Sequence, residues 1–467
     1  MSLRNPCWRA AAAVAAAAVA LMLLAGCTQP GSSSSPGVST GPVSKPPPRS
    51  LAGSLADWPT YDRTASRSGV SVSTPPPGRI SRSWTAKVDG AVYAQPLVVG
   101  SEVIIATEND SVYALSETTG AVLWHQHLAS PVPSGLPCGN VQPSGITGTP
   151  VADVAAGRLW LVTFTAKPRY EHVLWDLSIA TGRVLGQRPI DVAGSDPRAQ
   201  QQRGALTLLG SRVYVPFGGL YGDCSDYKGR VVGAPTSGVG PLVAFTTDNQ
   251  RQAGIWAPPG EAVRADSLYV ATGNGMPFDR VDDSDSVLRL SEKLTVLGRF
   301  TPDNFRSLSA DDQDLGSTAP ALMPGGLVFQ VGKQGTGYVL GGTALGGTGG
   351  ELTSARVCEG GFGGDVVDGS TVVFSCYSSL RAVRVSARKL RQVWEVSGIG
   401  AGPPVIAGGV VWDVTRNATL NGYRLATGTS VFEARTAKPV TDFPSPAASG
   451  SRLFVPEGSE VVCYLGI

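Results

Sequence analysis

Short hydrophobic runs separated by turn residues make up most of this chain. In residues 95–124 the runs fall at 97–99, 103–107, 112–115 and 121–125, with Gly100, Asn109 and Gly120 in the turns between them. The runs are rich in β-branched and aromatic residues, which favour strands, while Gly and Asn favour tight turns. This stretch therefore predicts four short antiparallel strands.

The second of these runs recurs to the end of the chain. Similar runs fall at 159–164, 213–217, 268–272, 327–331, 372–375, 410–414 and 453–456, which gives eight units with the first. The residue Trp124, which closes the first unit, has expected counterparts in Trp256, Trp394 and Phe432. Repeats with four strands each are typical of a propeller, because no blade can bury both faces alone. The sequence predicts an all-β eight-bladed propeller of four-stranded antiparallel blades.

The two ends of the repeat complement each other. Residues 80–88 predict a strand before the first complete unit, and the last unit ends without a full fourth strand. We expect the N-terminal strand to complete the last blade and close the ring, since closure removes exposed sheet edges. The alternative is an open edge that pairs with a strand of a partner.

The repeat also resembles a known family. The pattern Tyr113-Ala114-Leu115, followed by Thr119-Gly120 and Trp124, resembles the tryptophan-docking repeat of the PQQ-like (quinoprotein alcohol dehydrogenase-like) propellers across residues 58–467. This resemblance implies the fold more strongly than the function, because such propellers include dehydrogenases that use pyrroloquinoline quinone (PQQ) and cofactor-free lipoproteins that assist outer-membrane protein assembly. Segments 138–153, 269–275 and 314–320 resemble a secreted bacterial subfamily, and 57–61 resembles a leading segment that packs beneath or beside the first blade.

The N-terminal residues predict export and lipidation. Residues 1–26 form a lipoprotein signal peptide with a cationic start and an apolar stretch, and Leu24-Ala25-Gly26-Cys27 matches the bacterial lipobox. Residues 27–57 then form a Ser-, Pro- and Gly-rich tether, before a propeller over 58–467. We expect a monomer anchored by lipid on Cys27 to the extracytoplasmic side of the cell membrane. An ordinary secretory signal with an incidental Cys is the alternative.

Composition excludes several functions. Lys and Arg number 38 against 36 Asp and Glu, so the net charge of +2 gives no nucleic-acid footprint. With three His and no Cys-x-x-Cys pattern, the chain has almost no ligands for a zinc or haem site. We expect no metal and no nucleic-acid partner.

Five cysteines follow the lipobox, and an exported chain permits disulfides. Cys138 and Cys224 fall in long loops of neighbouring blades, while Cys358 and Cys376 flank one blade junction. We favour these two pairs and expect Cys463 to be a buried thiol in the last strand, although five cysteines allow other pairings.

The quinone-dependent members of the family set a test for a cofactor. In them a disulfide between adjacent cysteines caps the quinone, a Trp lies beneath it, and Glu, Asn and Asp bind calcium. This sequence has no adjacent cysteines, and no matching Glu, Asn and Asp set can be placed in it. We therefore expect no cofactor and no catalytic residue, and we interpret the Trp residues as blade-packing features. PQQ with calcium is the alternative.

The turns between second and third strands supply the candidate binding residues. In a propeller these turns gather on one face, and here they contain Glu108, Asp110, Asn274, Lys333, Arg416 and Asn417. Lys333 is the strongest candidate, because a lone cation between Gly332 and Gly335 would suit an anionic or carbonyl ligand. The alternative is that these are ordinary polar turns.

Two long loops, 217–241 and 276–286, also interrupt the repeat. The second contains the acidic run at 279–285, which lacks the glycine and final Glu of an EF-hand, so a solvated loop is favoured over a calcium site. The function we expect is a non-catalytic binding or assembly scaffold for an envelope protein or cell-wall component. The alternative is a PQQ-dependent quinoprotein dehydrogenase with a diverged site.

We predict that Cys27→Ser releases the protein from membranes, because stable anchoring requires more than one acyl chain and the lipobox cysteine carries them. Membrane fractionation and uptake of labelled fatty acid measure the effect. A wild-type protein that takes up no label, with a variant that still sediments with membranes, would show that the lipoprotein assignment is wrong.

Overall fold

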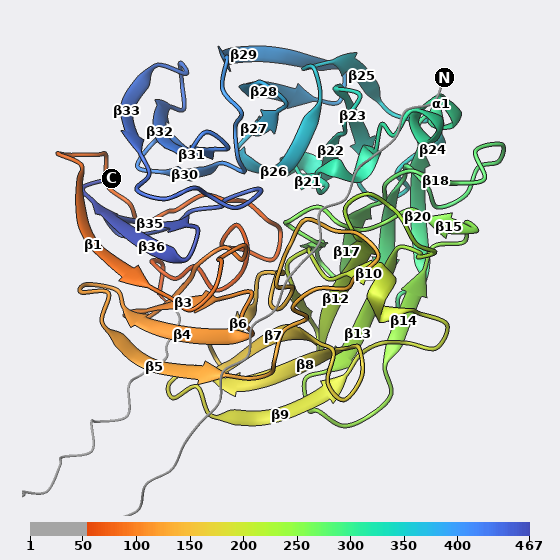
Figure 1. Ribbon diagram of the computed structural model, residues 1–467. Helices are drawn as coiled ribbons and strands as arrows, with labels where there is room; N and C mark the ends of the chain where they lie inside the picture. The colour runs from red at the N-terminus through yellow and green to blue at the C-terminus, as the bar shows by residue number, and fades with distance from the viewer. Residues whose placement is uncertain (1–53) are drawn as a thin grey trace, which may run out of the picture. The chain divides into compact units, whose positions relative to one another are not determined.

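The computed structural model describes residues 54–467, which form a ring of eight β-sheets (Figure 1). The predicted signal peptide, the lipidation site Cys27 and the tether up to residue 53 lie outside the described residues. The predicted all-β eight-bladed propeller is confirmed.

Each blade has four antiparallel strands, which follow one another in sequence from the axis outward except in blade 8, and the sheets of blades 3 and 4 carry one further short strand each. Blade 1 consists of β2 (Leu97–Val99), β3 (Glu102–Ala106), β4 (Ser111–Ser116) and β5 (Val122–His127). Blade 2 consists of β6 (Val151–Asp153), β7 (Arg158–Thr165), β8 (Glu171–Ser178) and β9 (Val184–Pro189). Blade 3 consists of β11 (Thr207–Leu209), β12 (Arg212–Gly219), β13 (Arg230–Pro235) and β14 (Val243–Thr246). Blade 4 consists of β16 (Ala262–Arg264), β17 (Ser267–Ala271), β19 (Val287–Ser291) and β20 (Val296–Thr301).

The second half of the ring repeats this plan. Blade 5 consists of β21 (Ala321–Leu322), β22 (Leu327–Val331), β23 (Thr336–Gly341) and β25 (Thr353–Arg356). Blade 6 consists of β26 (Gly361–Asp368), β27 (Thr371–Cys376), β28 (Ser379–Ser386) and β29 (Lys389–Ser397). Blade 7 consists of β30 (Val405–Ala407), β31 (Val410–Thr415), β32 (Thr419–Arg424) and β33 (Ser430–Arg435). Blade 8 consists of β34 (Ala447–Ser449), β35 (Arg452–Glu457), β36 (Glu460–Leu465) and β1 (Ser81–Lys87).

Short elements decorate the loops. They are β10 (Gln200–Gln201), β15 (Arg251–Gln252), β18 (Gly275–Met276), β24 (Gly347–Thr348), the helix α1 (Phe305–Ala310) and single 3-10 turns at Pro197–Ala199, Leu315–Ser317 and Pro324–Gly326. Over residues 54–467 no helix is both long enough and apolar enough to cross a bilayer.

The alternating strand direction defines two faces. The first strand of each blade runs away from one face and the second returns to it, so the turns between second and third strands share that face with the links between blades. We call this the top face. The turns between first and second strands, and between third and fourth strands, lie on the opposite, bottom face.

The hydrophobic core lies between blades. The inner strand β3 is buried throughout, whereas the outer strand β5 is largely exposed. Each core cluster joins adjacent blades: one, for example, packs Leu97 and Ile104 of blade 1 against Leu159 and Leu161 of blade 2. A blade is therefore stable only with its neighbours, as the repeat predicted.

Tryptophans of the outer strands dock on glycines of the next blade. A Cβ added at Gly182 would lie 2.4 Å from the Trp124 ring, and the Trp124 indole donates to Ile179 O at 2.9 Å. Trp394 has the same relation to Gly428, the glycine of the next blade's turn. The structure adds a docking residue that the sequence did not predict, Trp84 of β1, which packs on Gly120 and donates to Glu117 O.

The prediction that Trp256 closes a blade is wrong. It lies in the link between β15 and β16, where Gly218 and Gly273 pack against it. That link leads to the axis of the ring, so Trp256 belongs to the top face and not to an outer strand.

The predicted closing strand is confirmed. β1 pairs antiparallel with β36, from Ser81 opposite Leu465 to Lys87 opposite Glu460. This pairing places the first strand of the chain on the outer edge of the last blade (Figure 1).

Residues 57–71, which we call the plug, run across the bottom end of the central channel. Asp57 Oδ1 accepts the N–H of Gly100, in a bottom-face turn, at 2.9 Å. The plug backbone then bonds the innermost strands of five blades, through Trp58–Val98, Pro59–Ala152, Ala65–Val263, Ser68–Val367 and Gly69–Ile406. The leading segment thus crosses the ring, whereas the sequence resemblance placed it beneath or beside blade 1.

Arg67 ties the plug to blade 3, which its backbone does not bond, and adds a contact beside blade 4. The side chain is 2% exposed, and it donates to Thr60 Oγ1, Tyr61 O, Leu206 O, Thr207 Oγ1 and Glu261 O. Burial lowers the pKa of this guanidinium to about 10, although Glu261 and Asp62 oppose the shift. A buried arginine with this many acceptors has a structural role.

Both predicted disulfides are present. Cys138 is bonded to Cys224, with their Cα atoms 6.1 Å apart, and Cys358 to Cys376, with theirs 6.3 Å apart. Within the described residues Cys463 is the free cysteine, buried in β36 as expected.

We predict that Arg67→Met destabilises the whole ring by roughly 3–5 kcal/mol, since it leaves several buried acceptors without a donor. The midpoint of thermal unfolding measures the effect, and Arg391→Met on the exposed outer strand β29 is the control. If the two variants unfold at the same temperature, the plug does not hold the blades together.

Candidate functional site

Aromatic side chains and cations alternate around the top end of the channel. We call this set the channel mouth, and it consists of Tyr93, Arg203, Trp256, Lys333, Phe362, Tyr377, Arg416 and Phe443. Phe362 lies at the start of β26, and the others come from links between blades or from turns between second and third strands, which share the top face. Irregular backbone at the ends of rigid strands is where binding residues usually lie.

Lys333 and Asn274, two of the predicted residues, meet at Asp314. The Lys333 ammonium lies 2.8 Å from Asp314 Oδ2 and 2.8 Å from Asp312 Oδ1. The backbone N–H of Asn274 donates to Asp314 Oδ1 at 2.6 Å. The ammonium also lies 5.9 Å from the centre of the Trp256 ring.

The expectation that Lys333 is a lone cation is therefore wrong. Burial disfavours the charged ammonium, but Asp314 and Asp312 outweigh burial and raise the pKa of Lys333. Asp312 and Asp314 lie just before η2 (Leu315–Ser317), far from Lys333 in sequence, so the glycines around Lys333 gave no sign of them. An anionic ligand would have to compete with two carboxylates for this ammonium.

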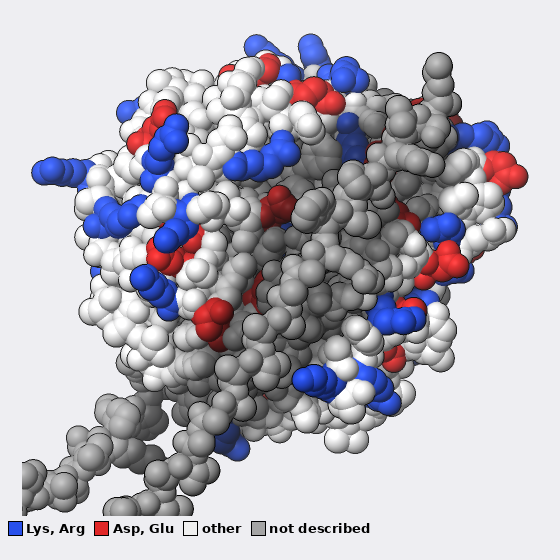
Figure 2. Space-filling view, viewed as in Figure 1, with Lys and Arg blue, Asp and Glu red and all other residues white. Residues whose placement is uncertain are grey.

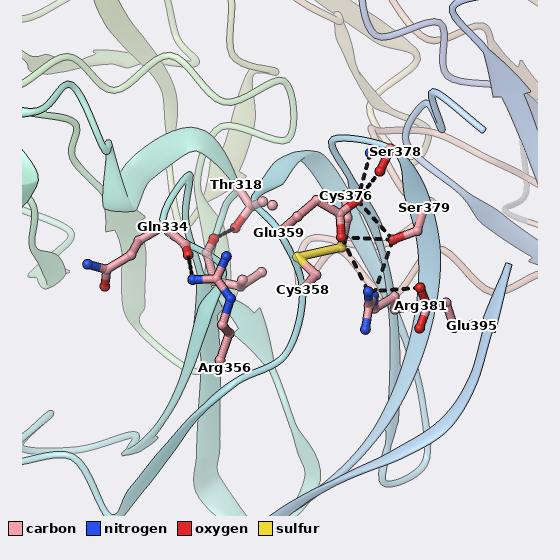
Figure 3. Close-up of a disulfide and its surroundings, with 12 residues drawn as sticks. Thr318, Gln334, Arg356, Cys358, Glu359, Cys376, Ser378, Ser379, Arg381 and Glu395 are labelled. Atoms are coloured by element: carbon pink, nitrogen blue, oxygen red, sulfur yellow. Dashed lines mark hydrogen bonds and ion pairs between the residues drawn. A yellow bond between two sulfur atoms is a disulfide. The ribbon is translucent and has the colours of Figure 1, made fainter. Parts of the chain in front are cut away.

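The turn of Lys333 rests on the second disulfide. Cys358 N and Val357 N both donate to Gly335 O, and Gly361 N donates to Gly332 O. The disulfide then fixes this link to β27 (Figure 3). The position of Lys333 thus depends on a link that is covalently held.

One cluster of potential metal ligands occurs among residues 54–467, and the same disulfide prevents it from binding a metal ion. Cys358, Glu359 and Cys376 bring their ligand atoms within 4.8 Å of one another. Their two sulfurs are bonded to each other, and Glu359 accepts hydrogen bonds from Ser378 and Arg381 (Figure 3). In this oxidised form the cluster has a structural role.

Arg416 and Asn417 lie further round the mouth. The Arg416 guanidinium carbon lies 5.2 Å from the centre of the Tyr377 ring, and its Nη2 donates to Tyr377 O at 2.7 Å. Tyr377 in turn packs on Phe362, with ring centres 6.1 Å apart. Asn417 is exposed beside them. This pair does not contact Lys333.

Glu108 and Asp110 form a third, separate group at the junction of blades 1 and 2. Both are buried, and Glu108 Oε2 accepts the N–H of Gly145 at 2.7 Å and the hydroxyl of Thr147 at 3.1 Å. A carboxylate that bonds the next interblade link in this way fixes backbone geometry. The six predicted binding residues thus lie in three groups, and whether they bind a ligand stays a prediction.

The acidic run at 279–285 is solvated only at its start, where residues 279–281 are exposed, so the expectation of a solvated loop is wrong for the rest of the run. Asp282, Asp283 and Asp285 are buried. Asp285 accepts from Ser309 Oγ at 2.6 Å and from Leu315 N at 2.9 Å, while Asp283 forms an ion pair with Arg299. These acids hold the loop onto the blade, since each accepts from a specific neighbour.

Five residues of the mouth escaped prediction, and Trp256 was assigned to a blade end; the five are Tyr93, Arg203, Phe362, Tyr377 and Phe443. Tyr93, Arg203 and Phe443 lie in interblade links, which have no hydrophobic period. The Arg203 guanidinium carbon lies 5.7 Å from the Tyr93 ring centre and 5.8 Å from the Phe443 ring centre, and Phe443 lies 6.4 Å from Trp256. The segments 138–153, 269–275 and 314–320, which resemble a secreted bacterial subfamily, could have indicated this face. They contribute Asn140, Asn274 and Asp314 to it.

Two hollows on the described surface lie away from the mouth. One of about 440 Å³ is lined by Leu128, Thr165, Lys167 and Trp175 at the rim of blades 1 and 2. Another of about 510 Å³ is lined by Asp57, Arg63 and Asp153 beside the plug. Charges of both signs are interspersed on the face seen in Figure 2.

Buried carboxyl groups are frequent in the ring. Burial raises the pKa of Glu108, Glu261 and Asp413 to about 7, and that of Asp285 and Asp365 to about 8. Asp365 lies on the innermost strand of blade 6, and its Oδ2 has no hydrogen-bond partner. These groups favour the protonated form in the folded state near neutral pH.

Comparisons with known proteins show one fold, which occurs in proteins of two different kinds of function. A family model described as outer membrane protein assembly factor BamB matches residues 78–282. Among curated proteins no sequence matches the chain. Among solved structures, quinohemoprotein alcohol dehydrogenase ADHIIG from Pseudomonas putida HK5 has a TM-score of 0.68 at 13% identity, over 88% of this chain and 80% of that one.

Two further structures are similar. The quinohemoprotein alcohol dehydrogenase of Comamonas testosteroni has a TM-score of 0.66 at 15% identity, over 88% of this chain and 80% of its own. BamB from Moraxella catarrhalis has a TM-score of 0.54 at 12% identity, over 83% of this chain and 98% of its own. Identities this low establish the fold and leave the function open.

We predict that the folded protein loses stability as the pH rises from about 4 to about 8. In that range the raised pKa values keep these carboxyls protonated in the folded state while the unfolded chain ionises, so the free energy of unfolding falls with rising pH. Asp365→Asn should unfold at a higher temperature than the wild type at pH 8.5 and at nearly the same temperature at pH 5. An equal shift at both pH values would contradict the assignment.

Proposed function

We propose, since this chain is a PQQ-like eight-bladed propeller, that it is a non-catalytic binding scaffold of the bacterial cell envelope. A lipid on Cys27 holds it on the extracytoplasmic side, and the channel mouth docks an envelope protein. The composition of the mouth is the observation that carries this proposal.

Three cations of the mouth lie against aromatic rings: Lys333 on Trp256, Arg416 on Tyr377, and Arg203 on both Tyr93 and Phe443. Trp, Tyr and Arg are the residues that most often dominate the energy of a protein interface. Two aromatic residues of the top face are also open to solvent, Tyr221 at 72% and Tyr377 at 60% exposure. A partner can bury these rings without any rearrangement of the blades.

The likeness to assembly propellers supports the same function. The family model over residues 78–282 is named for an outer membrane protein assembly factor, and BamB from Moraxella catarrhalis is covered over 98% of its length. A propeller presents a broad rigid face, which suits docking more than it suits a conformational cycle.

Two observations favour a dehydrogenase site and two oppose it. Trp256, Asn274 and Asp314 converge at the mouth, and the dehydrogenase structures are the more similar ones. Yet both carboxylate oxygens of Asp314 are already engaged, Oδ1 by the N–H of Asn274 and Oδ2 by the ammonium of Lys333. Asp314 is therefore a poor oxygen ligand for calcium. The two disulfides, moreover, join cysteines far apart in sequence. The residues do not fit PQQ with calcium.

We predict that a photo-crosslinking amino acid at position 221 or 377 joins the protein to a discrete partner in intact envelopes. A tyrosine-to-alanine change at the other position should reduce that product about 10-fold or more, while the unfolding temperature stays unchanged because both rings are exposed.

The control is the same crosslinker at Val239, which is 79% exposed in a turn on the bottom face. A product from Val239 with none from positions 221 and 377 would place the partner on the bottom face and contradict the proposal. Crosslinks to glycan in place of protein would make the partner a cell-wall component.

A further inference from the structure

Two arginines are buried near the axis of the ring, and they differ in their bonding. Arg67 makes five hydrogen bonds from its guanidinium. Arg203, which is 8% exposed, makes one, from Nη2 to Asp442 O at 3.1 Å. A guanidinium has five N–H donors, so most of the donors of Arg203 are unused by residues 54–467.

Arg203 also lacks an ionic partner among the described residues. The charged and titratable groups that face it are Tyr61, Glu108, Tyr93 and Asp442, and burial lowers its pKa. The carboxylates nearby are engaged elsewhere: Glu108 bonds Gly145 and Thr147, and Asp442 Oδ2 accepts from Asn140 at 2.8 Å. A buried cation without a partner is costly, and such a group is retained where it binds something.

The surroundings of Arg203 define a receptor. Tyr61 of the plug faces Arg203 from inside the ring, and its hydroxyl lies 2.9 Å from Ser445 Oγ in the link before β34. Tyr93 and Phe443 lie beside the guanidinium, and Phe443 leads on to Trp256. Phe443 has a backbone φ of +57°, an unfavourable value for a bulky residue, and strain of this kind is characteristic of functional sites.

We propose that Arg203 is a receptor for a carboxylate at the base of the channel mouth. The two oxygens of the carboxylate accept parallel N–H bonds from the planar guanidinium, and the group attached to it packs on Phe443 and Trp256. This proposal rests on the proposed function in one respect, that the mouth is a binding surface, and it names the chemistry that the mouth recognises.

The charge balance favours a carboxylate over a phosphate. One unpaired cation can neutralise one negative charge, and Glu108, Asp442, Asp312 and Asp314 all lie around the mouth. A dianion would carry a second charge into this acidic surrounding, at an electrostatic cost. The carboxylate can belong to a small organic acid or to the C-terminus of a partner chain, and the chemistry at Arg203 is the same for both.

The test uses the mature protein with its full propeller. Benzoate, a short peptide ending in a free Phe carboxylate, and the same peptide as its amide are titrated by calorimetry at constant ionic strength. We expect benzoate or the free peptide, or both, to bind the wild type, and the amide not to bind. Benzoate alone would identify small acids as the source, and the free peptide alone would identify a chain terminus.

The variants separate binding from folding. Arg203→Met should weaken carboxylate binding at least about 10-fold. Arg203→Lys should weaken binding less, since it keeps the positive charge and loses only the paired N–H donors of the guanidinium. Arg391→Met, which removes an exposed cation from the outer strand, should bind as the wild type does. Arg203→Met should not lower the unfolding temperature, because it removes an unpaired buried charge.

Failure to bind any of the carboxylates, or equal binding by Arg203→Met and the wild type, would overturn the proposal. So would a loss of unfolding temperature in Arg203→Met as large as that in Arg67→Met, because Arg203 would then be structural. If crosslinks at positions 221 and 377 persist under either result, protein docking stands and the carboxylate receptor alone falls.

Discussion

The structure depends on the fact that a four-stranded blade cannot bury its two faces by itself. Every core cluster in the described residues is shared between neighbouring blades, as where Phe329 of blade 5 packs on Phe374 of blade 6 at 5.5 Å between ring centres. Stability is therefore a property of the closed ring. The closing strand β1 and the plug both serve this requirement, one at the outer edge and one at the axis.

The plug explains how a ring with a central channel can contain buried charges. Arg67 spans from the plug to blades 3 and 4, and Gln95 of the first interblade link bonds both Trp58 and Pro446 O. The axis is thus filled by hydrogen-bonded polar groups in place of an apolar core. Such a network specifies one arrangement of the blades, since its hydrogen bonds join the plug to several of them. The top end of the channel, by contrast, keeps Arg203 with few bonds, which marks it as the end that is available for binding.

Much of this fold could be predicted from the sequence, and the reason is periodicity. The second strand of each blade is a continuous hydrophobic run, because it is covered on both faces, and all eight runs were recognised in register. The closing strand could be predicted because one extra strand precedes the first unit and the last unit lacks its fourth strand.

Trp256 was misplaced because a Trp in a link has the same appearance in the sequence as a Trp that ends a strand. Lys333 was judged by its neighbouring glycines, whereas its environment is set by Asp312 and Asp314 from another blade junction. Arg203 lies in an aperiodic link, where only the assembled ring shows what surrounds it.

Closure of blade 8 by β1 has a consequence for how the chain must fold. The two strands that complete the ring are almost a full chain length apart, as the contact between Arg82 and Tyr464 over 382 positions shows. Contacts this distant in sequence form slowly, because a large loop must be closed before they are made. Until β36 has been synthesised, β1 presents an open edge that can pair with other chains. The ring gains its full stability only when β36 pairs with β1, so the interval between synthesis and closure is the period in which aggregation or the help of a chaperone decides the yield.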